Sequence, residues 1–453
     1  MDKRDFLKIT GALVTSSLLP HVVSAEQDPA QKSAGPLTNW AGNYTFQAKH
    51  LYQPKTAEEV SQVVKSCTKL RALGARHSFN SIADSTENQV SLKALDSISL
   101  NADSKTVTVG AGVTYGQLAP YIDSRGFALH NLASLPHISI VGACATATHG
   151  SGTTNGNLST AVSAFQIVTH DGAVHTVSRA KNPDVFSGAV VHLGALGVLT
   201  AITLDVQPTF QVAQAVYENL SFTHLEHHLD DIFTSGYSVS LFTNWQNHRA
   251  TQVWIKHRIS PDTARTFASD FYGAKLATRN LHPLAGHSAE NCTEQLGIPG
   301  PWYERLPHFR MNFTPSSGAE LQTEYFVPRN RAYPAILAVE QLRDRITPHL
   351  FITELRTIAS DNLWLSPCYQ RDSLAIHFTW KPEWPDVQRI LPLIEEKLEP
   401  FQARPHWAKL NTISPARLNQ LYPKLFDYRT LVTEHDPRGK FRNLFIDTNI
   451  FGV

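Results

Sequence analysis

The sequence is poor in several features that mark common protein classes. Four of its 453 residues are cysteine, and their wide spacing fits neither a metal-ligand pattern nor a small disulfide-dense fold. Lys and Arg total 40 against 39 Asp and Glu, so the charge balance gives no electrostatic footprint for nucleic acid or an anionic membrane. No G-x-G-x-x-G follows a predicted strand, which leaves a nicotinamide site of the Rossmann type unsupported. We therefore expect a globular protein with no nucleic-acid partner.

Long apolar runs are also missing, except at the N-terminus. There Lys3 and Arg4 precede an apolar run over residues 9–19, which is too short to span a bilayer, and small residues follow. The charged start resembles a twin-arginine signal with Lys3 in the place of the first arginine. We expect residues 1–25 to be a signal peptide for export to the periplasm or the medium. We expect no stable membrane association.

The stretch from Ala128 to Gly156 is the most informative part of the chain. It is too small and glycine-rich for a helix, and no alternation of apolar and polar residues sustains it as a strand. Gly142, Gly150 and Gly152 allow close backbone approach, while serine and threonine hydroxyls supply short donors. Such a loop suits a polar guest, of which phosphate is the commonest. Its length favours a functional loop, since long irregular segments in compact domains are usually functional.

The elements before residue 208 have the order of a nucleotide-binding α/β half. Thr56 and Glu59 form a capping box that opens a helix to about Cys67. Leu70–Leu73 is typical of a short strand, and it leads into the loop Gly74–Ser78. Further strands are predicted at residues 97–100, 106–109, 165–169, 174–177 and 202–206, and a second capped helix at residues 114–126.

The pattern changes after Pro208, where we place a domain boundary, and residues 260–320 indicate mostly loop. Glu354 and Arg356 lie two residues apart on a predicted strand, so they point the same way and place an acceptor beside a forked donor. The strand at residues 375–381 has an apolar face of Ile376, Phe378 and Trp380, opposite a polar face of His377, Thr379 and Lys381. For an arbitrary polar stripe of this kind, a solvated face would be the usual explanation. A helix is predicted from residue 384 to residue 398.

Several blocks of the sequence resemble the vanillyl-alcohol-oxidase-type FAD-binding flavoproteins, and in most detail those that oxidise linear polyols. These blocks are ALGARHSFN (72–80), LASLPHIS (132–139), VSLFTNW (239–245), residues 291–329, residues 354–380 and ARPHWAKL (403–410). The resemblance implies an α+β fold, in which a two-part FAD-binding domain carries an inserted α+β substrate (cap) domain. Residues 26–37 are polar and contain Pro29 and Pro36, which indicates a linker. With the boundary at Pro208, we expect the FAD-binding domain at 38–208, the substrate domain at 209–410 and a segment returning to the FAD domain at 411–453.

The same resemblance implies that FAD is the cofactor and that His77 holds it covalently. The implied cofactor-binding residues are Leu73, Gly74, Ala75, Arg76, His77, Ser78, Ser134, Ser139, Gly142, Thr146, Ala147, Thr148, His149, Gly197, Val198 and His406. The family usually carries glycine immediately before the flavinylated histidine, whereas this chain has Arg76. A non-glycine residue is strained there if the loop needs a positive φ. Arg76 could instead reach the flavin phosphates.

Oxidation of an alcohol removes a hydride and a proton, and no side chain accepts a hydride, so a redox cofactor must do so. The resemblance implies the catalytic residues Lys409, His377, Arg356 and Glu354, and the substrate-binding residues Ser134, Glu354, Arg356, Thr379 and Lys409. Ser134 would hold the reacting hydroxyl, while Glu354 and Arg356 would bind hydroxyls along the substrate. Lys409 would stabilise the developing alkoxide and His377 would accept the proton. Which of these two residues takes the proton stays open.

The expected function is therefore FAD-dependent oxidation of a primary alcohol of a linear polyol, such as xylitol or sorbitol, to the aldose. O₂ would be reduced to H₂O₂, and we expect a monomer. The alternatives are a sugar-lactone oxidase or dehydrogenase of the same family, and an inactive flavin-binding module. A further alternative is a zinc-binding periplasmic protein, because His224 and His228 have the helical i, i+4 spacing of some zinc ligands. Neither an H-E-x-x-H pattern nor a third ligand accompanies them, so we expect a solvated helix face and no metal site.

Overall fold

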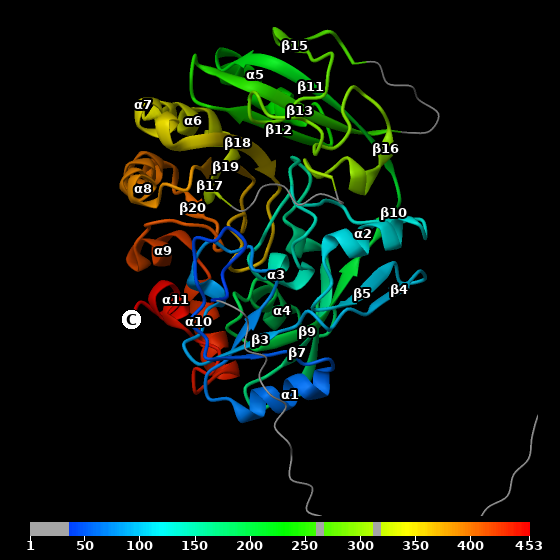
Figure 1. Ribbon diagram of the computed structural model, residues 1–453, viewed down its shortest axis with the longest axis vertical. Helices are drawn as coiled ribbons and strands as arrows, with labels where there is room; N and C mark the ends of the chain where they lie inside the picture. Colours follow the sequence, from blue (N-terminus) through cyan, green and yellow to red (C-terminus); the bar gives the residue numbers. More distant parts are fainter. Residues whose placement is uncertain (1–35, 260–266, 311–318) are drawn as a thin grey trace, which may run out of the picture. The chain divides into compact units, whose positions relative to one another are not determined.

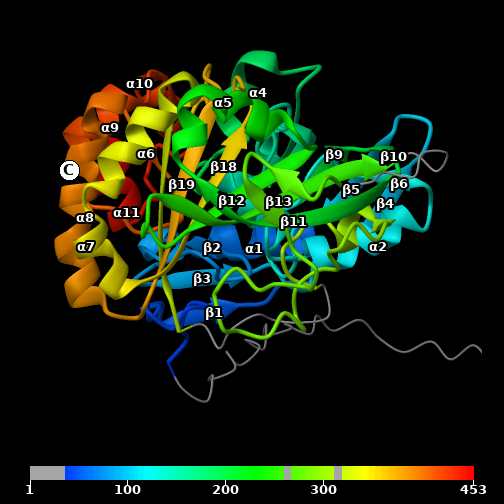
Figure 2. The same cartoon turned by 90° about the horizontal axis from the view of Figure 1, so that it is seen from above.

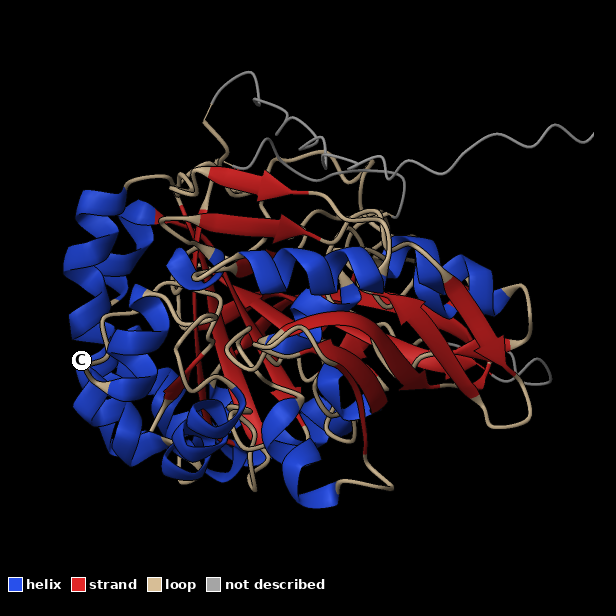
Figure 3. Cartoon of the chain, turned by 90° about the horizontal axis from the view of Figure 1, so that it is seen from below, coloured by secondary structure: helices blue, strands red, loops and turns tan. Residues whose placement is uncertain are grey.

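Residues 36–259, 267–310 and 319–453 are described by the computed structural model, and their strands form four sheets (Figure 1). The predicted signal peptide, and the predicted linker up to residue 35, lie outside the described residues. Helices and strands are both abundant, which is the mixed content of an α+β protein (Figure 3). Within the described ranges, no helix combines the length and the apolar character needed to cross a membrane. All four cysteines are buried and free.

A three-stranded parallel sheet carries the loop at residues 74–78. Its strands, in order, are β1 (His50–Tyr52), β3 (Asn88–Ser91) and β2 (Arg71–Leu73), and the neighbouring helix is α1 (Ala57–Ser66). The helix begins at the predicted residue, because Thr56 Oγ1 accepts a hydrogen bond from Glu59 N at 3.2 Å. The predicted capping box is only half formed, since the Glu59 carboxylate accepts from Lys55 N at 2.7 Å in place of Thr56 N. Val60 and Val64 are fully buried on one face of α1. Both valines belong to the same hydrophobic core as Val90 of β3.

A five-stranded antiparallel sheet contains the other strands predicted before residue 208. Its order is β4 (Ile98–Asn101), β5 (Thr106–Gly110), β9 (Val198–Asp205), β7 (Val162–Val168) and β8 (Val174–Ser178). The predicted capping box is present at α2 (Tyr115–Asp123), where Gln117 N donates to Thr114 Oγ1 and Thr114 N donates to Gln117 Oε1. The remaining elements of this part are β6 (Phe127–Ala128), α4 (Pro183–Ala189) and β10 (Gln207–Pro208).

The stretch from residue 128 to residue 156 contains a short helix, so the prediction that it is irregular throughout is wrong. The helix is α3 (Ile140–Ala145), and every residue of it except Gly142 is buried. Burial in the core outweighs the poor helix propensity of glycine. A Cβ on Gly142 would lie 2.8 Å from Ser139 Oγ, so the small residue is needed for this close approach.

A ten-stranded sheet begins just after the predicted boundary at Pro208. Its long strands, in order, are β11 (Gln211–Ser221), β13 (Arg249–Ile259), β12 (Ser238–Thr243), β18 (Leu350–Ile358), β19 (Ser373–Trp380) and β17 (Leu321–Pro328). Figure 2 shows the first five in that order. Its short strands are β14 (Asp270–Phe271), β15 (Ala274–Leu276), β16 (Gly300–Pro301) and β20 (Arg404–Pro405). One face packs in a hydrophobic core with α5 (Thr223–Thr234), α6 (Ala332–Glu340) and α8 (Trp384–Leu398), and α7 (Arg343–Ile346) follows α6.

The C-terminal segment packs against the first half of the chain. Its helices are α9 (Pro415–Leu421), α10 (Leu425–His435) and α11 (Leu444–Ile446); α10 contacts α4, and α11 contacts the turn at Ser81–Ala83. Leu418 and Tyr428 belong to the same hydrophobic core as the buried residues of α1. Asn443 Nδ2 also donates to the carbonyls of Ser81 and Asp84. The two ends of the described chain therefore stabilise one another.

Candidate active site

A cavity of about 780 Å³ is lined both by loops of the first half of the chain and by the long sheet. Predicted site residues in its lining are Leu73, Gly74, Ala75, Arg76, His77, Ser78, Ser134, Ser139, Gly142, Thr146, Thr148, His149, Glu354, Arg356, His377, Thr379, His406 and Lys409. This volume falls in the usual range of cofactor and small-molecule sites. The structure therefore brings the predicted cofactor loops and the predicted polar strands to one space.

Three predicted cofactor-binding residues do not line this cavity. Ala147 is buried between two threonines that do line it, with a φ of 55°. Gly197 and Val198 lie at the start of β9, and a Cβ on Gly197 would lie 2.5 Å from the Val168 carbonyl oxygen. Glycine is therefore needed there for strand packing. The part of this segment that reaches the cavity is residues 192–194.

Gly74 and Ser139 join the two loops of the cavity. The Ala75 N–H donates to Ser139 Oγ at 3.3 Å, and a Cβ on Gly74 would lie 2.7 Å from the same oxygen. His77 follows in this loop, with Nδ1 2.9 Å from the Ala75 carbonyl oxygen and its ring stacked on Trp40 at 5.2 Å between centroids. Burial lowers the pKa of His77 to about 4, so its ring is neutral at neutral pH.

Arg76 occupies the conformation in which the resemblance expects glycine. Its φ is 63°, which costs a side-chain-bearing residue roughly 1–2 kcal/mol. The guanidinium Nη1 donates to the Thr38 carbonyl at 3.0 Å on the surface, and this bond gives Arg76 a partner other than a cofactor phosphate. Leu193, on the same cavity wall, also has a positive φ of 49°. Two residues of the cavity lining thus have a backbone conformation that is unfavourable for a residue with a side chain.

Three strands align acidic and basic side chains on the cavity face of the long sheet. In the register of β17, β19 and β18, Glu324 lies opposite His377, and His377 lies opposite Glu354. Thr379 and Arg356 share this face, because residues two apart in a strand point the same way. Together with Lys409, which follows β20, the charged and imidazole groups form what we call the polar wall: Glu324, Glu354, Arg356, His377 and Lys409.

Glu324 is a fully buried carboxylate shared by three predicted site residues. Its Oε1 accepts from His149 Nε2 at 3.0 Å and from Arg356 Nη2 at 3.2 Å. Its Oε2 accepts from Lys409 Nζ at 2.7 Å. Burial by itself would raise the pKa of Glu324, but Lys409 and His149 hold it well below its usual range. The carboxylate is therefore ionised and orients the two cations.

Glu354 and Arg356 interact directly as well as sharing a face. Arg356 Nε lies 3.4 Å from Glu354 Oε1, and Arg356 Nη1 donates to Ser134 Oγ at 3.2 Å. His308 Nε2 donates to the same Glu354 oxygen at 2.7 Å. Burial would raise the pKa of Glu354, but Arg356 and His308 hold it below its usual range. The Glu354 carboxylate is therefore an ionised acceptor in the cavity lining, beside the forked donor of Arg356, as predicted from the sequence.

His377 is a neutral base beside a cation. Its Nε2 donates to Gln322 Oε1 at 3.1 Å, and Gln322 Nε2 donates to Glu320 Oε1 at 2.6 Å, which orients the amide. Burial and the charge of Lys409 hold the pKa of His377 well below its usual value. Burial also lowers the pKa of Lys409, while Glu324 acts in the opposite direction. With its proton on Nε2, His377 keeps a lone pair on Nδ1.

Sequence reasoning missed Glu324, His308 and Gln322 as site residues. Glu324 is the one acidic residue in the apolar strand LQTEYFVP. That pattern is a usable signal, because a charge in the middle of a buried strand needs partners. His308 lies in a segment without periodicity, where no pattern points to a neighbour.

The two histidines of the zinc alternative have other neighbours. The rings of His224 and His228 pack near Tyr272, with centroid distances of 6.1 and 4.9 Å. His228 Nδ1 also lies 3.2 Å from Asp231 Oδ2. These contacts account for both side chains on the surface of α5.

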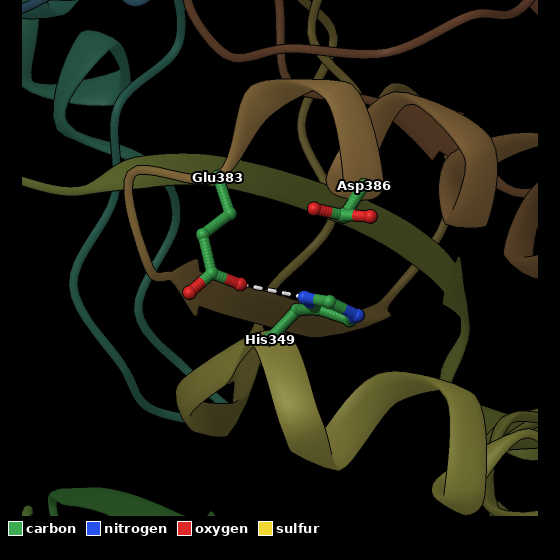
Figure 4. Close-up of side chains that lie close together, drawn as sticks. All are labelled: His349, Glu383 and Asp386. Atoms are coloured by element: carbon green, nitrogen blue, oxygen red, sulfur yellow. Dashed lines mark hydrogen bonds and ion pairs between the residues drawn. The ribbon is translucent and has the colours of Figure 1, made fainter.

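A different group of three potential metal ligands lies at the start of α8 (Figure 4). It consists of His349, Glu383 and Asp386, whose ligand atoms lie within 4.8 Å of one another. His349 Nδ1 donates to Glu383 Oε2 at 2.6 Å, and all three side chains are partly exposed. None of them lines the cavity. The hydrogen bond between His349 and Glu383 is sufficient to explain why these two side chains lie together.

The residues at the loop side of the cavity fit FAD. Hydroxyls of Ser78, Thr146 and Thr148 lie in the lining beside the main chain of both loops, which suits a pyrophosphate. Within the described chain, the buried Nε2 of His192 has no hydrogen-bond partner, so this wall retains a polar atom for a bound group. Apolar side chains such as Leu135 and Val141 offer surface to a flat ring.

Known protein families match both halves of this site. An FAD binding domain family matches residues 48–178, and a D-arabinono-1,4-lactone oxidase family matches residues 317–449. The chain is 48% identical to alditol oxidase of Streptomyces sp. (strain IKD472 / FERM P-14339), over 90% of this chain and 98% of that protein. It is 26% identical to L-gulonolactone oxidase of Mus musculus, over 90% of this chain and 97% of that protein.

The architecture is also similar to a solved structure. Cholesterol oxidase from B. sterolicum superposes with a TM-score of 0.72 at 15% sequence identity, covering 92% of this chain and 96% of that chain. At this identity the likeness concerns the fold alone. It confirms the predicted α+β class, with an FAD-binding domain and a substrate domain. The match to the FAD binding domain identifies FAD as the cofactor.

Proposed function

The chain belongs to the vanillyl-alcohol-oxidase-type flavoprotein family, in the branch that contains alditol oxidase, and we propose that it oxidises a primary alcohol of a linear polyol to the aldose. In this proposal O₂ is reduced to H₂O₂. The observation that carries the proposal is the polar wall. Glu354, Arg356 and Lys409 line one cavity with acceptors and donors, which suits a chain of adjacent hydroxyls. A linear polyol such as xylitol or sorbitol has that chemistry.

Four residues of the polar wall and Ser134 have separate tasks in this reaction, while Glu324 holds Lys409 and Arg356 in place. Bound FAD supplies the hydride acceptor. Ser134 and Arg356, joined by a hydrogen bond, hold the reacting hydroxyl, and Glu354 accepts hydrogen bonds from the distal hydroxyls. Lys409 stabilises the developing alkoxide. His377 takes the hydroxyl proton at Nδ1, because its Nε2 already donates to Gln322.

An oxygen-electrode assay combined with anaerobic flavin bleaching tests this function. The substrates are xylitol, sorbitol, mannitol, glycerol and a sugar lactone. We expect xylitol or sorbitol to bleach the flavin and to drive O₂ uptake. Turnover of the lactone without any polyol would replace the proposal by a sugar-lactone oxidase. Dye reduction without O₂ uptake would indicate a dehydrogenase, and no bleaching by any substrate would indicate an inactive flavin-binding module.

We propose in addition that His77 holds FAD covalently. Its neutral ring lies in the cavity lining, in the cofactor loop at residues 74–78, and an unprotonated ring nitrogen is the nucleophile that attachment needs. Acid precipitation should leave flavin on the wild-type polypeptide and release it from His77→Ala. The exposed His175→Ala is the matched control and should retain flavin. Release from the wild type would contradict covalent attachment.

Export and a monomeric state complete the proposal. The charged and apolar pattern of residues 1–25 supports export, with a twin-arginine-like start. Expression in a host that lacks the twin-arginine translocase should leave the protein in the cytoplasm, whereas normal export in that host would exclude this route. Light scattering of the purified holoenzyme should give the mass of one chain, and a multiple of that mass would contradict a monomer.

A further inference from the structure

A buried lysine lies behind the polar wall. Lys256, on β13, is fully buried and does not line the cavity. Its Nζ donates to the carbonyls of Leu306 and Pro307 at 2.6 and 3.1 Å, and it lies 3.3 Å from His308 Nδ1. An ammonium group has three N–H donors and no acceptor. Each donor of Lys256 therefore has an acceptor, and one of these is the imidazole nitrogen.

His308 connects this lysine to Glu354. Its ring is held edge-on by Phe242 and Trp254, at centroid distances of 5.4 and 5.2 Å. Burial lowers the pKa of His308 to about 4, so the ring is neutral and carries one proton. Because Nδ1 accepts from Lys256, that proton is on Nε2, which donates to Glu354 Oε1 at 2.7 Å.

We propose that Lys256 and His308 are positioning residues for Glu354. The lysine holds His308 in the tautomer that donates to the carboxylate, and this bond aims Glu354 at the distal hydroxyls of the substrate. Without Lys256, the ring proton is free to move to Nδ1, and the Nε2 lone pair then faces the Glu354 oxygen. Two acceptors at this distance repel, so the carboxylate turns away. The claim that Glu354 binds a polyol rests on the proposed function. The claim that Lys256 fixes the tautomer of His308 does not depend on that function.

The arrangement also predicts how substrate binding depends on pH. The ionisable groups that act on Lys256 are Glu354, Cys292, Arg356, Arg305 and His308. Burial lowers the pKa of Lys256 to about 7, against the opposing charge of Glu354. Loss of its proton removes one donor as the pH rises through that value. We therefore expect the KM of the wild type for a polyol to increase above about pH 7. The KM of Lys256→Met should not show this increase.

Kinetics of single and double variants separate positioning from a merely structural role. Lys256→Met should raise the KM for xylitol about tenfold, as for one charge-assisted hydrogen bond, with a smaller change in kcat. In His308→Gln the amide donates to Glu354 without help from the lysine, so adding Lys256→Met should raise KM about twofold or less. The exposed Lys275→Met is the matched control. Equal effects of Lys256→Met in both backgrounds would overturn the proposal.

Histidine ¹⁵N NMR of the labelled holoenzyme tests the tautomer without any substrate. The His308 signal is assigned by its absence in His308→Gln. It should show the Nε2–H tautomer in the wild type and move toward Nδ1–H in Lys256→Met. Lys256→Leu, which likewise has no donor for His308 Nδ1, replaces the methionine variant if that variant does not fold. An unchanged tautomer would overturn the proposal. A changed tautomer in a protein that oxidises no polyol would contradict the proposed function and leave the positioning pair standing.

Discussion

At the scale of single residues, two buried carboxylates of one cavity have different partners. Glu324 binds Lys409, Arg356 and His149, so its charge is matched within the protein. Glu354 faces the Nε of Arg356 at 3.4 Å and accepts one short hydrogen bond from a neutral ring. Glu324 is thus suited to hold cations in place. Glu354 is suited to accept hydrogen bonds from a ligand.

Variants of Glu354 and Lys409 should separate substrate binding from transition-state stabilisation. Glu354→Gln should cost about 1–3 kcal/mol of binding, and it should raise KM more for xylitol than for a short alcohol without distal hydroxyls. Lys409→Met should slow anaerobic flavin reduction by both substrates roughly 10²–10³-fold, with little change in KM. Stopped-flow absorbance measures both effects. If Glu354→Gln slowed both substrates equally at saturation, the roles of the two residues would be inverted.

Glu324→Gln should damage both stability and activity. The change removes the charge that Lys409 and Arg356 share, and a buried ion left without its partner costs about 3–5 kcal/mol. We expect a lower midpoint in urea unfolding and flavin reduction slowed by about 10². Glu340→Gln is the matched control, because Glu340 is a buried acid that pairs with His248 away from the cavity. Wild-type reduction rates in Glu324→Gln would show that Lys409 needs no counter-charge for the reaction.

At the scale of elements, the loop at residues 73–78 should accept glycine at position 76 but not a β-branched residue. Valine at the observed φ of 63° places its Cβ branches in a region open to few residues besides glycine. Arg76→Val should therefore destabilise the protein by about 1–2 kcal/mol and reduce the fraction of flavin that survives acid precipitation. Arg76→Gly should retain flavin like the wild type. Thermal melting and flavin absorbance of the precipitate measure both variants, and equal behaviour of the two would show that the loop tolerates a changed backbone.

The sequence predicted those helices and strands whose formation depends on local patterns. The N-cap at Thr56, the capping box at Thr114, the alternating face of β19 and the helix α8 all depend on neighbours within a few residues. Glu324 and Lys256 instead lie in long strands beside buried apolar residues, where a buried charge needs a partner but the pattern does not show which one. Their partners come from strand register and from segments without periodicity. Helix α3 was missed because tertiary burial, and not propensity, stabilises it.

At the scale of the whole described chain, a wall of the cavity is connected to the C-terminal segment. Arg71 donates to the carbonyls of Gly194 and Phe441, and Tyr428 donates to the carbonyl of His192 at 2.5 Å. The C-terminal segment is thereby tied to the wall where residues 192–194 line the cavity. The family resemblance predicted that the C-terminal segment returns to the FAD domain. Periodicity could not predict this, because these contacts join residues far apart in the chain.

The same tight packing predicts how the molecule responds to acid. Burial lowers the pKa of His192 and His308 from 6.5 to about 3 and about 4. Between those values the unfolded chain binds more protons than the folded one, so the free energy of unfolding falls as the pH is lowered below about 6.5. Calorimetry of the holoenzyme should show a Tm that drops steeply toward pH 4. His192→Asn, whose amide oxygen can still accept from Gly194 N, should flatten part of this slope. The exposed His175→Asn should leave the slope unchanged, and a Tm independent of pH across this window would mean that the buried rings are protonated in the folded state.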